Sequence, residues 1–314
     1  MVRIYFHVNW ADETDAEFLR AIRRQSPAGS ARWQDVEAVS SPDAADVHVA
    51  FDQPAPGLDP DRTLLVCSEP PCNGICSGWE EVDAFAKYPV EEYYKPQRWW
   101  VDRSYDELRS LAPLEKSRDL SWITTDKGRN LHPLLRAART VAMTAGFRKF
   151  ERKSVPLLDR GPNDGHILRM RFLDRLLDAE PGILDLYGRG AFGGPHYRGE
   201  LDDKWDGLAD YRYSLAVENY HGPNYFSEKL ADAWLAWCMP VYWGCTNLDE
   251  FFPEESYVEV DIESRNAPQH IKEIVESDLR ERNLDAIAEA RRLLLEEYQI
   301  WPTIHRWVHE RVHN

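Results

Sequence analysis

Apolar positions along the chain switch between the period of a strand and the period of a helix. Residues 2–8 alternate as a half-buried strand does, residues 13–25 carry apolar side chains on one helical face, and residues 63–67 form a short apolar strand. Further strands are predicted at 47–51, 120–124, 183–187, 213–217 and 240–243, and further helices at 167–178, 227–237, 267–278, 284–298 and 303–312. Strands separated by helical patterns predict parallel β-α-β units, here in two α/β halves that meet near 110–120.

Composition narrows the class of protein. The 314 residues are 43% hydrophobic and 12% aromatic, which is enough to fill the cores of about two domains. The net charge of −16 argues against a general nucleic-acid binder, so we expect no nucleic-acid partner. Five cysteines fit a reducing compartment better than a disulfide scaffold, and the opening segment is not a signal peptide. We therefore expect a cytoplasmic protein.

One segment departs from the acidic average. Residues 127–153 hold eight basic side chains and one acidic side chain, a local net charge of +7, and their apolar positions have helical spacing. This pattern predicts a basic amphipathic helix. We interpret it as a helix that covers the face between the halves. The alternative is a peripheral contact with the anionic inner face of a membrane, because basic amphipathic helices bind such surfaces.

The stretch 211–244 carries the clearest candidate chemistry. An alternating strand that we expect to end at Glu218 and Asn219 is followed by a polar loop, and Ser227 is a candidate N-cap that places Glu228 and Lys229 in the first helical turn. Glutamate is favourable at a helix start, whereas lysine opposes the helix dipole. A lysine at this position therefore favours a nearby anion such as a phosphate, which helix N-termini bind well.

Three short motifs in this stretch agree in order and spacing with a known family. They are VEN at 217–219, YFSEK at 225–229 and MPVYWG at 239–244, and together they resemble the signature of the α1,3-fucosyltransferases, glycosyltransferase family ten. The resemblance is strong over 165–262 and thinner over 60–72. It implies the GT-B fold, in which two Rossmann-like α/β domains face each other across a cleft.

The resemblance also implies roles for domains and residues. Residues 1–115 would bind the acceptor, residues 116–298 would bind a GDP-sugar around a basic insertion at about 127–160, and a helix at about 299–314 would return to the first domain. Lys229 would bind the donor pyrophosphate, and Glu228 would hold the ribose hydroxyls. The other implied donor-site residues are Asn219 and Tyr225, which would line the site, Glu218 beside them, and Arg169 and Arg189, which would reach the diphosphate.

Glu69 is the candidate general base. It follows an apolar strand, and the carboxyl ends of parallel strands face the crevice where α/β sheets bind ligands. The family has a glutamate at the matching position that is assigned as the base, and the resemblance carries this role to Glu69. Without the resemblance, a solvated carboxylate at a strand end is the plainer interpretation.

Several other patterns compete with this hypothesis. Gly188, Gly190 and Gly193 spell the dinucleotide fingerprint, but no amphipathic helix follows to receive a pyrophosphate, so an NAD-dependent oxidoreductase is a remote alternative. Cys67, Cys72 and Cys76 cluster without a nearby histidine, and we interpret them as three incidental thiols.

Two patterns that mimic metal sites are interpreted without a metal. His305, His309 and His313 recur every four residues on the last helix, where two could ligate a metal, but we interpret them as a surface stripe near a helix C-terminus. Asp59-Pro60-Asp61 imitates a D-x-D motif, and its proline indicates a turn. We therefore expect no bound metal and no required cofactor, and we leave stimulation by a divalent cation open.

These observations lead to one functional hypothesis with alternatives. The resemblance implies an inverting glycosyltransferase that moves L-fucose from GDP-β-L-fucose to a hydroxyl of a glycan or glycolipid acceptor, in α1,3 linkage. One alternative is a transferase that uses another GDP-sugar. Another is a protein that binds nucleotide sugars without turnover.

Overall fold

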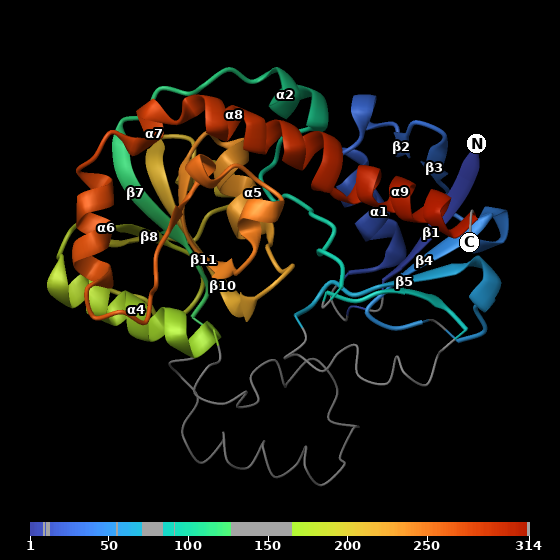
Figure 1. Ribbon diagram of the computed structural model, residues 1–314, viewed down its shortest axis with the longest axis horizontal. Helices are drawn as coiled ribbons and strands as arrows, with labels where there is room; N and C mark the ends of the chain where they lie inside the picture. The colour runs from blue at the N-terminus through green and yellow to red at the C-terminus, as the bar shows by residue number, and fades with distance from the viewer. Residues whose placement is uncertain are drawn as a thin grey trace, which may run out of the picture.

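The computed structural model describes residues 1–8, 10, 13–54, 56–70, 84–90, 92–126 and 165–312. The basic segment 127–160 and the cysteines at 72 and 76 lie outside these residues. The described chain forms two six-stranded sheets, which lie side by side in Figure 1. The expectation of two α/β halves with parallel sheets is confirmed.

The first sheet has the strand order β2-β3-β1-β4-β5-β6 and is parallel except for one hairpin. Its strands are β1 (Val2–Val8), β2 (Arg32–Trp33), β3 (Val36–Ala38), β4 (Val47–Phe51), β5 (Thr63–Val66) and β6 (Ala86–Tyr88). The pairing of β2 with β3 is antiparallel, and the sequence pattern did not predict this hairpin. Its strands are too short to show a period.

The second sheet has the order β12-β11-β10-β7-β8-β9, and all of its described pairs are parallel. Its strands are β7 (Arg118–Ile123), β8 (Asp185–Tyr187), β9 (Tyr197–Gly199), β10 (Tyr211–Gly222), β11 (Met239–Cys245) and β12 (Val258–Glu259). The prediction that Glu218 and Asn219 end their strand is wrong. The strand continues to Gly222 because the register with β11 shifts after Val217, which lets pairing resume at Gly222 and Cys245.

Most of the described helices lie at positions that the apolar periodicity predicted, with ends that differ by a few residues, whereas the short helices α2 and α7 were not predicted. They are α1 (Asp15–Arg23), α2 (Tyr105–Ser110), α4 (Gly165–Ala179), α5 (Glu228–Leu235), α6 (Ala267–Val275), α7 (Leu279–Arg282), α8 (Leu284–Leu293), the π-helical turn Leu294–Tyr298 and α9 (Ile300–Val312). A capping box starts α1, in which the Thr14 hydroxyl accepts from the Glu17 amide and the Glu17 carboxylate accepts from the Thr14 amide. Among the described residues, no helix is long and apolar enough to span a membrane.

The chain passes from the first half to the second through a connection that is hydrogen-bonded to both. Gln97 donates its side-chain amide to the Phe226 carbonyl at 2.9 Å, and the Trp100 amide donates to the Asp232 carboxylate at 2.7 Å. In the other direction, the Gln25 side chain donates to the Trp99 carbonyl at 2.9 Å. The segment is therefore fixed by polar groups of both halves, although its many aromatic and proline residues predict irregular structure.

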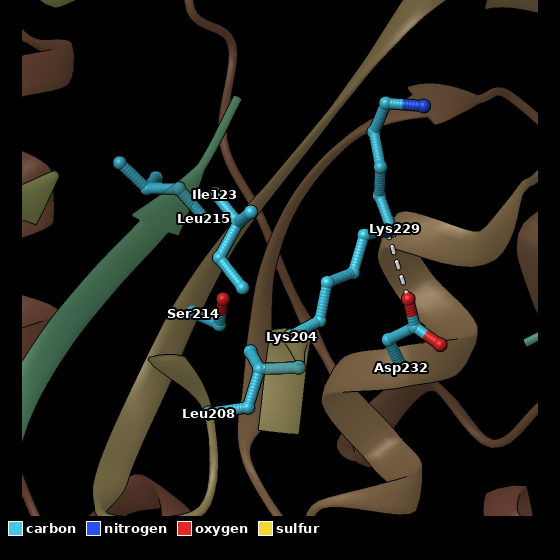
Figure 2. A pocket seen from close by; sticks show the side chains of 7 residues that line it. All are labelled: Ile123, Lys204, Leu208, Ser214, Leu215, Lys229 and Asp232. Atoms are coloured by element: carbon cyan, nitrogen blue, oxygen red, sulfur yellow. Dashed lines mark hydrogen bonds and ion pairs between the residues drawn. The ribbon is translucent and has the colours of Figure 1, made fainter. Parts of the chain in front are cut away.

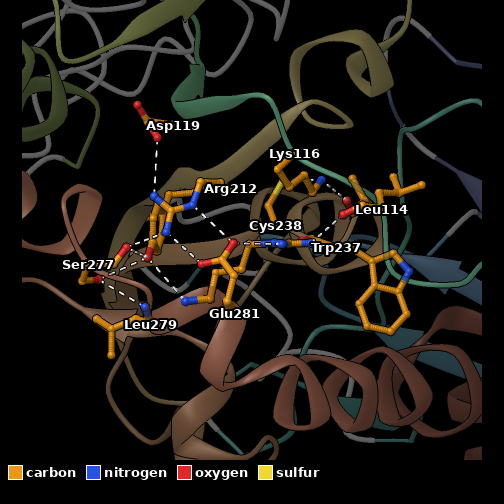
Figure 3. Close-up of polar contacts among 12 residues, drawn as sticks. Leu114, Lys116, Asp119, Arg212, Trp237, Cys238, Ser277, Leu279 and Glu281 are labelled. Atoms are coloured by element: carbon orange, nitrogen blue, oxygen red, sulfur yellow. Dashed lines mark hydrogen bonds and ion pairs between the residues drawn. The ribbon is translucent and has the colours of Figure 1, made fainter.

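A second polar network holds the start of the second half (Figure 3). The Lys116 ammonium donates to the carbonyls of Ala209 and Ala236 at 2.7 and 2.6 Å. Next to it, Arg212 pairs with Glu281 at 2.8 Å, and this guanidinium lowers the pKa of the Glu281 carboxyl to about 2. The network joins the starts of the strands β7 and β10 to the helix α7. It therefore fixes the end of the sheet that lies opposite the loops at the carboxyl edge.

Helix α9 returns to the first half and lies over it in Figure 1. Trp301 is 1% exposed, and its indole N–H donates to the Ile22 carbonyl at 2.9 Å. Trp307 stacks on Tyr88 with ring centroids 4.3 Å apart. Two buried aromatic side chains therefore attach the C-terminal helix to elements that are more than two hundred residues away in sequence.

Replacing Trp301 should destabilise the protein more than replacing an exposed tryptophan. The variant Trp301→Ala removes a buried indole and leaves a cavity, so we expect the free energy of unfolding to fall by about 3–5 kcal/mol. Trp100 is 57% exposed, and Trp100→Ala is the matched control, with an expected loss below about 1 kcal/mol. Urea unfolding measures both. Equal losses would show that α9 is not anchored by this side chain.

Candidate donor site at the carboxyl end of β10

The candidate site forms where β10 gives way to α5. Ser227 is the N-cap of α5, and its hydroxyl accepts from the Lys229 amide at 3.4 Å, as the sequence predicted. Glu228 and Lys229 therefore lie in the first helical turn. The free N–H groups of this turn and the helix dipole favour an anionic ligand here.

A fully buried carboxylate organises this turn. Glu218 is 0% exposed and accepts from the Ser227 amide at 2.8 Å, from the Ser227 hydroxyl at 2.7 Å and from the Lys229 ammonium at 3.2 Å. Burying a carboxylate costs several kcal/mol unless charge and hydrogen bonds compensate, and here both are present. The role that Glu218 plays in the structure is to hold Ser227 and Lys229 in place.

Glu228 and Lys229 form a second ion pair on the same turn, with 3.2 Å between the carboxylate oxygen and the ammonium. Burial alone would raise the pKa of Glu228, but the ammonium groups of Lys229, Lys204 and Lys95 outweigh burial and hold the pKa well below its usual range. Burial alone would lower the pKa of Lys229, but Glu218 and Glu228 raise it. Both groups are therefore charged at neutral pH.

Lys204 and Asp232 extend the cluster, and the sequence analysis did not single them out. The Lys204 ammonium lies 2.9 Å from the Asp232 carboxylate, which is 2% exposed. Figure 2 shows Lys204 reaching across to Asp232 while Lys229 extends away from this pair. Asp232 follows Glu228 by four residues, a spacing that places both on one face of a helix and could have identified it. No local pattern marks Lys204.

The cavity beside these residues is small. It has a volume of about 20 Å³ and is lined by Ile123, Lys204, Leu208, Ser214, Leu215, Lys229 and Asp232. This is room for roughly one water molecule, whereas pockets for small-molecule ligands are typically about 300–1,000 Å³. This cavity is therefore too small to hold a nucleotide.

Arg169 adds a guanidinium to the cluster from helix α4. It is 4% exposed, its Nη2 lies 2.7 Å from Nδ1 of His166, and its positive charge acts on Lys229 and opposes the rise in the Lys229 pKa. A glycine explains how α4 comes so near. A side chain at Gly165 would meet the backbone of Asn219 at 2.4 Å, so only glycine lets the helix start against the end of β10.

Asn219 and Tyr225 lie together beside the cluster. The Tyr225 hydroxyl donates to the Asn219 side-chain carbonyl at 3.1 Å, and the Lys95 ammonium lies 5.5 Å from the centre of the Tyr225 ring. Arg189 has a different environment, because its side chain is 79% exposed and pairs with Glu200 at 3.1 Å. The structure thus brings the implied donor residues into one region, whereas the contact described for Arg189 is with Glu200. These roles stay predictions.

Glu69 is half-buried and follows β5, at the carboxyl end of the first sheet. Two residues earlier, Cys67 packs in one apolar cluster with Tyr225 of the second half. The turn is fixed by Asp52, which accepts from the Ser68 amide at 2.8 Å and from the Trp10 indole at 2.7 Å. Asp52 is 1% exposed and has a φ of 66°, and the sequence analysis missed it because no motif marks it.

The glycine fingerprint has a packing explanation. Gly188 has a φ of 127°, and a side chain there would collide with the Thr124 carbonyl at 1.7 Å. The next element after β8 is the strand β9, so no helix N-terminus is available to hold a dinucleotide pyrophosphate. Gly188 and Gly190 serve the close approach of two chain segments, and the oxidoreductase alternative loses its support.

Two smaller expectations are also decided. Asp59-Pro60-Asp61 is a capped turn, in which the Asp59 carboxylate accepts from the Asp61 amide at 3.0 Å. The expectation of three incidental thiols is wrong for Cys67, which takes part in a disulfide bond. Its partner lies outside the described residues. Proximity of sulfur atoms depends on how the chain folds after Glu69, which spacing in the sequence does not determine.

Comparison with known proteins finds a family that part of this chain resembles. A model of the C-terminal region of glycosyltransferase family 10, the fucosyltransferases, matches residues 164–280. This segment is therefore similar to the C-terminal domain of that family. The α-(1,3)-fucosyltransferase FucT of Helicobacter pylori is 31% identical over 97 residues, which are 30% of this chain and 18% of the relative. The matched part therefore spans less than a fifth of that relative's length.

The fold is shared more widely than the sequence. A crystal structure of an α1,3-fucosyltransferase with GDP superposes with a TM-score of 0.51 at 17% identity, covering 100% of this chain and 90% of the other. The two parallel-sheet domains therefore have the GT-B arrangement, as expected from the resemblance to the family. At this identity the likeness concerns the fold alone.

Asp232 should make stability depend on pH. Burial raises the pKa of its carboxyl from the usual 3.8, although Lys204 opposes the rise, so the folded protein holds this proton more tightly than the unfolded chain does. The stability that this tighter proton binding contributes is present below pH 3.8, and it is lost as the pH rises through the pKa of Asp232 in the folded protein. In Asp232→Asn the side chain does not titrate, so the variant does not lose this stability as the pH rises.

The stability of Asp232→Asn relative to the wild type should consequently increase from about pH 4 to about pH 7, as measured by urea unfolding. Asp203→Asn, at a more exposed carboxylate on the same segment as Lys204, is the control and should show a smaller change. A pH-independent difference for Asp232→Asn would contradict the raised pKa.

Proposed function

We propose that this protein is an inverting glycosyltransferase that moves L-fucose from GDP-β-L-fucose to a hydroxyl of a glycan or glycolipid acceptor, forming an α1,3 linkage. The observation that carries the proposal is the convergence of Arg169, Lys204 and Lys229 at the N-terminus of α5, within a segment that matches the family 10 model. The Helicobacter relative is named an α-(1,3)-fucosyltransferase, which supports fucose as the transferred sugar and the α1,3 linkage.

The charge of the site suits a nucleoside diphosphate. Four cations act on the cluster, which are Lys95, Arg169, Lys204 and Lys229, against the carboxylates of Glu218, Glu228 and Asp232. Since burial disfavours the ionised form of Asp232, the cluster has an excess of positive charge, and the helix N-terminus adds to it. A diphosphate would compensate this excess. In this proposal Glu228 accepts hydrogen bonds from the ribose hydroxyls.

In this proposal Glu69 acts as the general base. The reaction is a single displacement in which the acceptor hydroxyl attacks the anomeric carbon, the bond from that carbon to the GDP oxygen breaks, and Glu69 takes the hydroxyl proton. Arg169 and Lys229 stabilise the negative charge that develops on departing GDP. The shared cluster of Cys67 and Tyr225 supports this assignment, because it joins the Glu69 turn of the first half to the donor loop of the second.

In this proposal no metal is required, because Arg169, Lys204 and Lys229 supply the positive charge that compensates the diphosphate. The GDP-sugar and the acceptor are then the partners of this site. A cytoplasmic location, stimulation by a divalent cation and membrane contact through residues 127–153 stay predictions.

Removing the proposed base should stop transfer and spare donor binding. In Glu69→Gln the side chain keeps its size but cannot take a proton, so we expect kcat to fall by about 10²–10⁴-fold in a released-GDP assay. The dissociation constant of GDP, measured by calorimetry, should change less than about threefold, because Glu69 does not contact the nucleotide in this proposal.

The matched control is Glu13→Gln, which alters a carboxylate that pairs with Arg98 in the first half. Its kcat should stay close to the wild-type value. Wild-type turnover by Glu69→Gln would remove this residue from the mechanism, while loss of GDP binding would assign it to the donor site.

Removing the first-turn lysine should weaken GDP. A charge-assisted hydrogen bond contributes about 1.5–3 kcal/mol, so Lys229→Gln should raise the dissociation constant of GDP by about 10–100-fold. Lys272→Gln, which removes an exposed lysine of α6 that pairs with Glu180, is the control and should leave the constant unchanged. Circular dichroism checks that both variants fold.

A thermal-shift series separates the alternative ligands. GDP and GDP-fucose should raise the melting temperature, whereas UDP and NAD should not, because a ligand stabilises a protein only where it binds. A shift with NAD alone would contradict the proposal. A shift with GDP-mannose of the same size as with GDP-fucose would change the assigned sugar and leave the nucleotide.

A further inference from the structure

Two histidines of α9 and one aspartate in the turn between β2 and β3 lie close together. Nε2 of His305 lies 2.9 Å from Oδ1 of Asp35, and Nε2 of His309 lies 3.1 Å from the same oxygen. The three ligand atoms all lie within 4.8 Å of one another. The histidines were expected to form a surface stripe, yet their side chains are only 20% and 33% exposed.

The fold holds each of these side chains in position. His305 and His309 are four residues apart on α9, so they lie on one face, with ring centroids 4.7 Å apart. Asp35 sits in the tight hairpin between β2 and β3, where Gln34 has a φ of 50° and the Asp35 carbonyl accepts from the Val2 amide at 2.7 Å. The hairpin thus holds the carboxylate against the helix without needing a ligand.

The spacing is close to what a metal ion requires. A tetrahedral zinc ion with bonds of about 2.0–2.1 Å separates its ligand atoms by roughly 3.3–3.4 Å. The two observed nitrogen-to-oxygen distances, 2.9 and 3.1 Å, need only a few tenths of an ångström of opening. Small side-chain rotations would provide this, because all three residues keep some exposure to solvent.

The chemistry of the donors and the charges nearby also fit a cation. Two imidazoles and a carboxylate form a set that suits Zn²⁺ and related first-row ions. The arginines that flank the site in sequence have other partners. Arg306 donates to the Tyr94 hydroxyl, Arg311 donates to the carbonyls of Pro60 and Thr63, and Arg32 donates to the Gln34 carbonyl.

A hydrogen-bonded cluster in which both Nε2–H groups donate to one carboxylate oxygen also fits the contacts. The two arrangements differ in what they imply for added metal. A cluster that is only hydrogen-bonded has no affinity for a transition ion beyond that of scattered surface histidines. Three ligand atoms that can reach one ion, and that two separate elements already hold in place, bind a transition ion more tightly than scattered histidines do. The reason is that little ordering is required on binding.

We propose that Asp35, His305 and His309 bind a divalent transition-metal ion of the zinc class, with water completing the coordination. The ion joins α9 to the β2–β3 hairpin. Because α9 continues from α8 of the second half and packs on the first, the ion strengthens the C-terminal attachment between the halves. It takes no part in the proposed sugar transfer, so the site is independent of that proposal.

The test uses the full chain without a polyhistidine tag, stripped with a chelator. Titration with Zn²⁺ in calorimetry should show one saturable site per chain, and Co²⁺ should develop the visible absorption of a tetrahedral nitrogen and oxygen site. The melting temperature should rise with metal concentration, because the ion binds the folded state. Asp35→Asn and His309→Gln should each abolish the saturable site and the Co²⁺ absorption.

Two control variants locate the ion. His270→Gln alters an exposed histidine of α6, and His48→Gln alters the other histidine pair, in which Nδ1 of His48 lies 3.0 Å from Nε2 of His7. Both should bind Zn²⁺ like the wild type. The proposal is overturned if the wild type shows no saturable site, or if the site survives Asp35→Asn and His309→Gln, or if His48→Gln abolishes it.

Discussion

A carboxylate with no exposure to solvent is the constraint on which the candidate site depends. Glu218 lies in the middle of the second sheet, where an unpaired charge would cost several kcal/mol. Its two oxygens are compensated by the amide and hydroxyl of Ser227 and by the ammonium of Lys229. The same contacts that make burial tolerable also fix the start of α5. The contacts that stabilise the buried carboxylate on β10 are therefore the same contacts that orient the N-terminus of α5.

The rest of the site is arranged around this point by contacts between distant segments. Arg169 arrives from α4 because Gly165 allows the helix to touch Asn219, and Asp232 connects the site to the Trp100 backbone of the first half. These contacts connect the position of the first half to the charge cluster of the second. Movement between the halves would therefore change the surroundings of Asp232 and of the Lys204 ammonium that pairs with it.

The connection between the halves is made twice, once by the segment around Gln97 and once by α8 and α9. The backbone of Gln97 pairs with Gln299, so the two connecting segments lie against each other. Buried aromatic side chains such as Trp301 fix the returning helix. A metal ion at Asp35, His305 and His309 would strengthen the attachment of α9 to the first half. The Glu69 turn, held by Asp52, lies on the first half, which these contacts attach to the second half.

Much of the secondary structure was readable from the chain because burial imposes a period on it. The strand at Val2–Val8 and the helices α4, α5 and α9 follow apolar positions that recur every second residue or every three to four residues. Short elements such as the β2–β3 hairpin escaped, since two or three residues show no period. The end of β10 was placed too early, because a register shift depends on the neighbouring strand β11.

The sequence by itself determined the α/β class, the cap at Ser227 and the motifs of the segment that matches the family 10 model, because these depend on residues close together in the chain. Only the tertiary structure decided that Lys204 faces Asp232, that Asp52 holds the Ser68 turn, and that Asp35 meets His305 and His309. Each of these contacts joins residues that are separated by 16 to 274 positions. Local patterns carry no information about such pairs, because packing of whole elements brings them together.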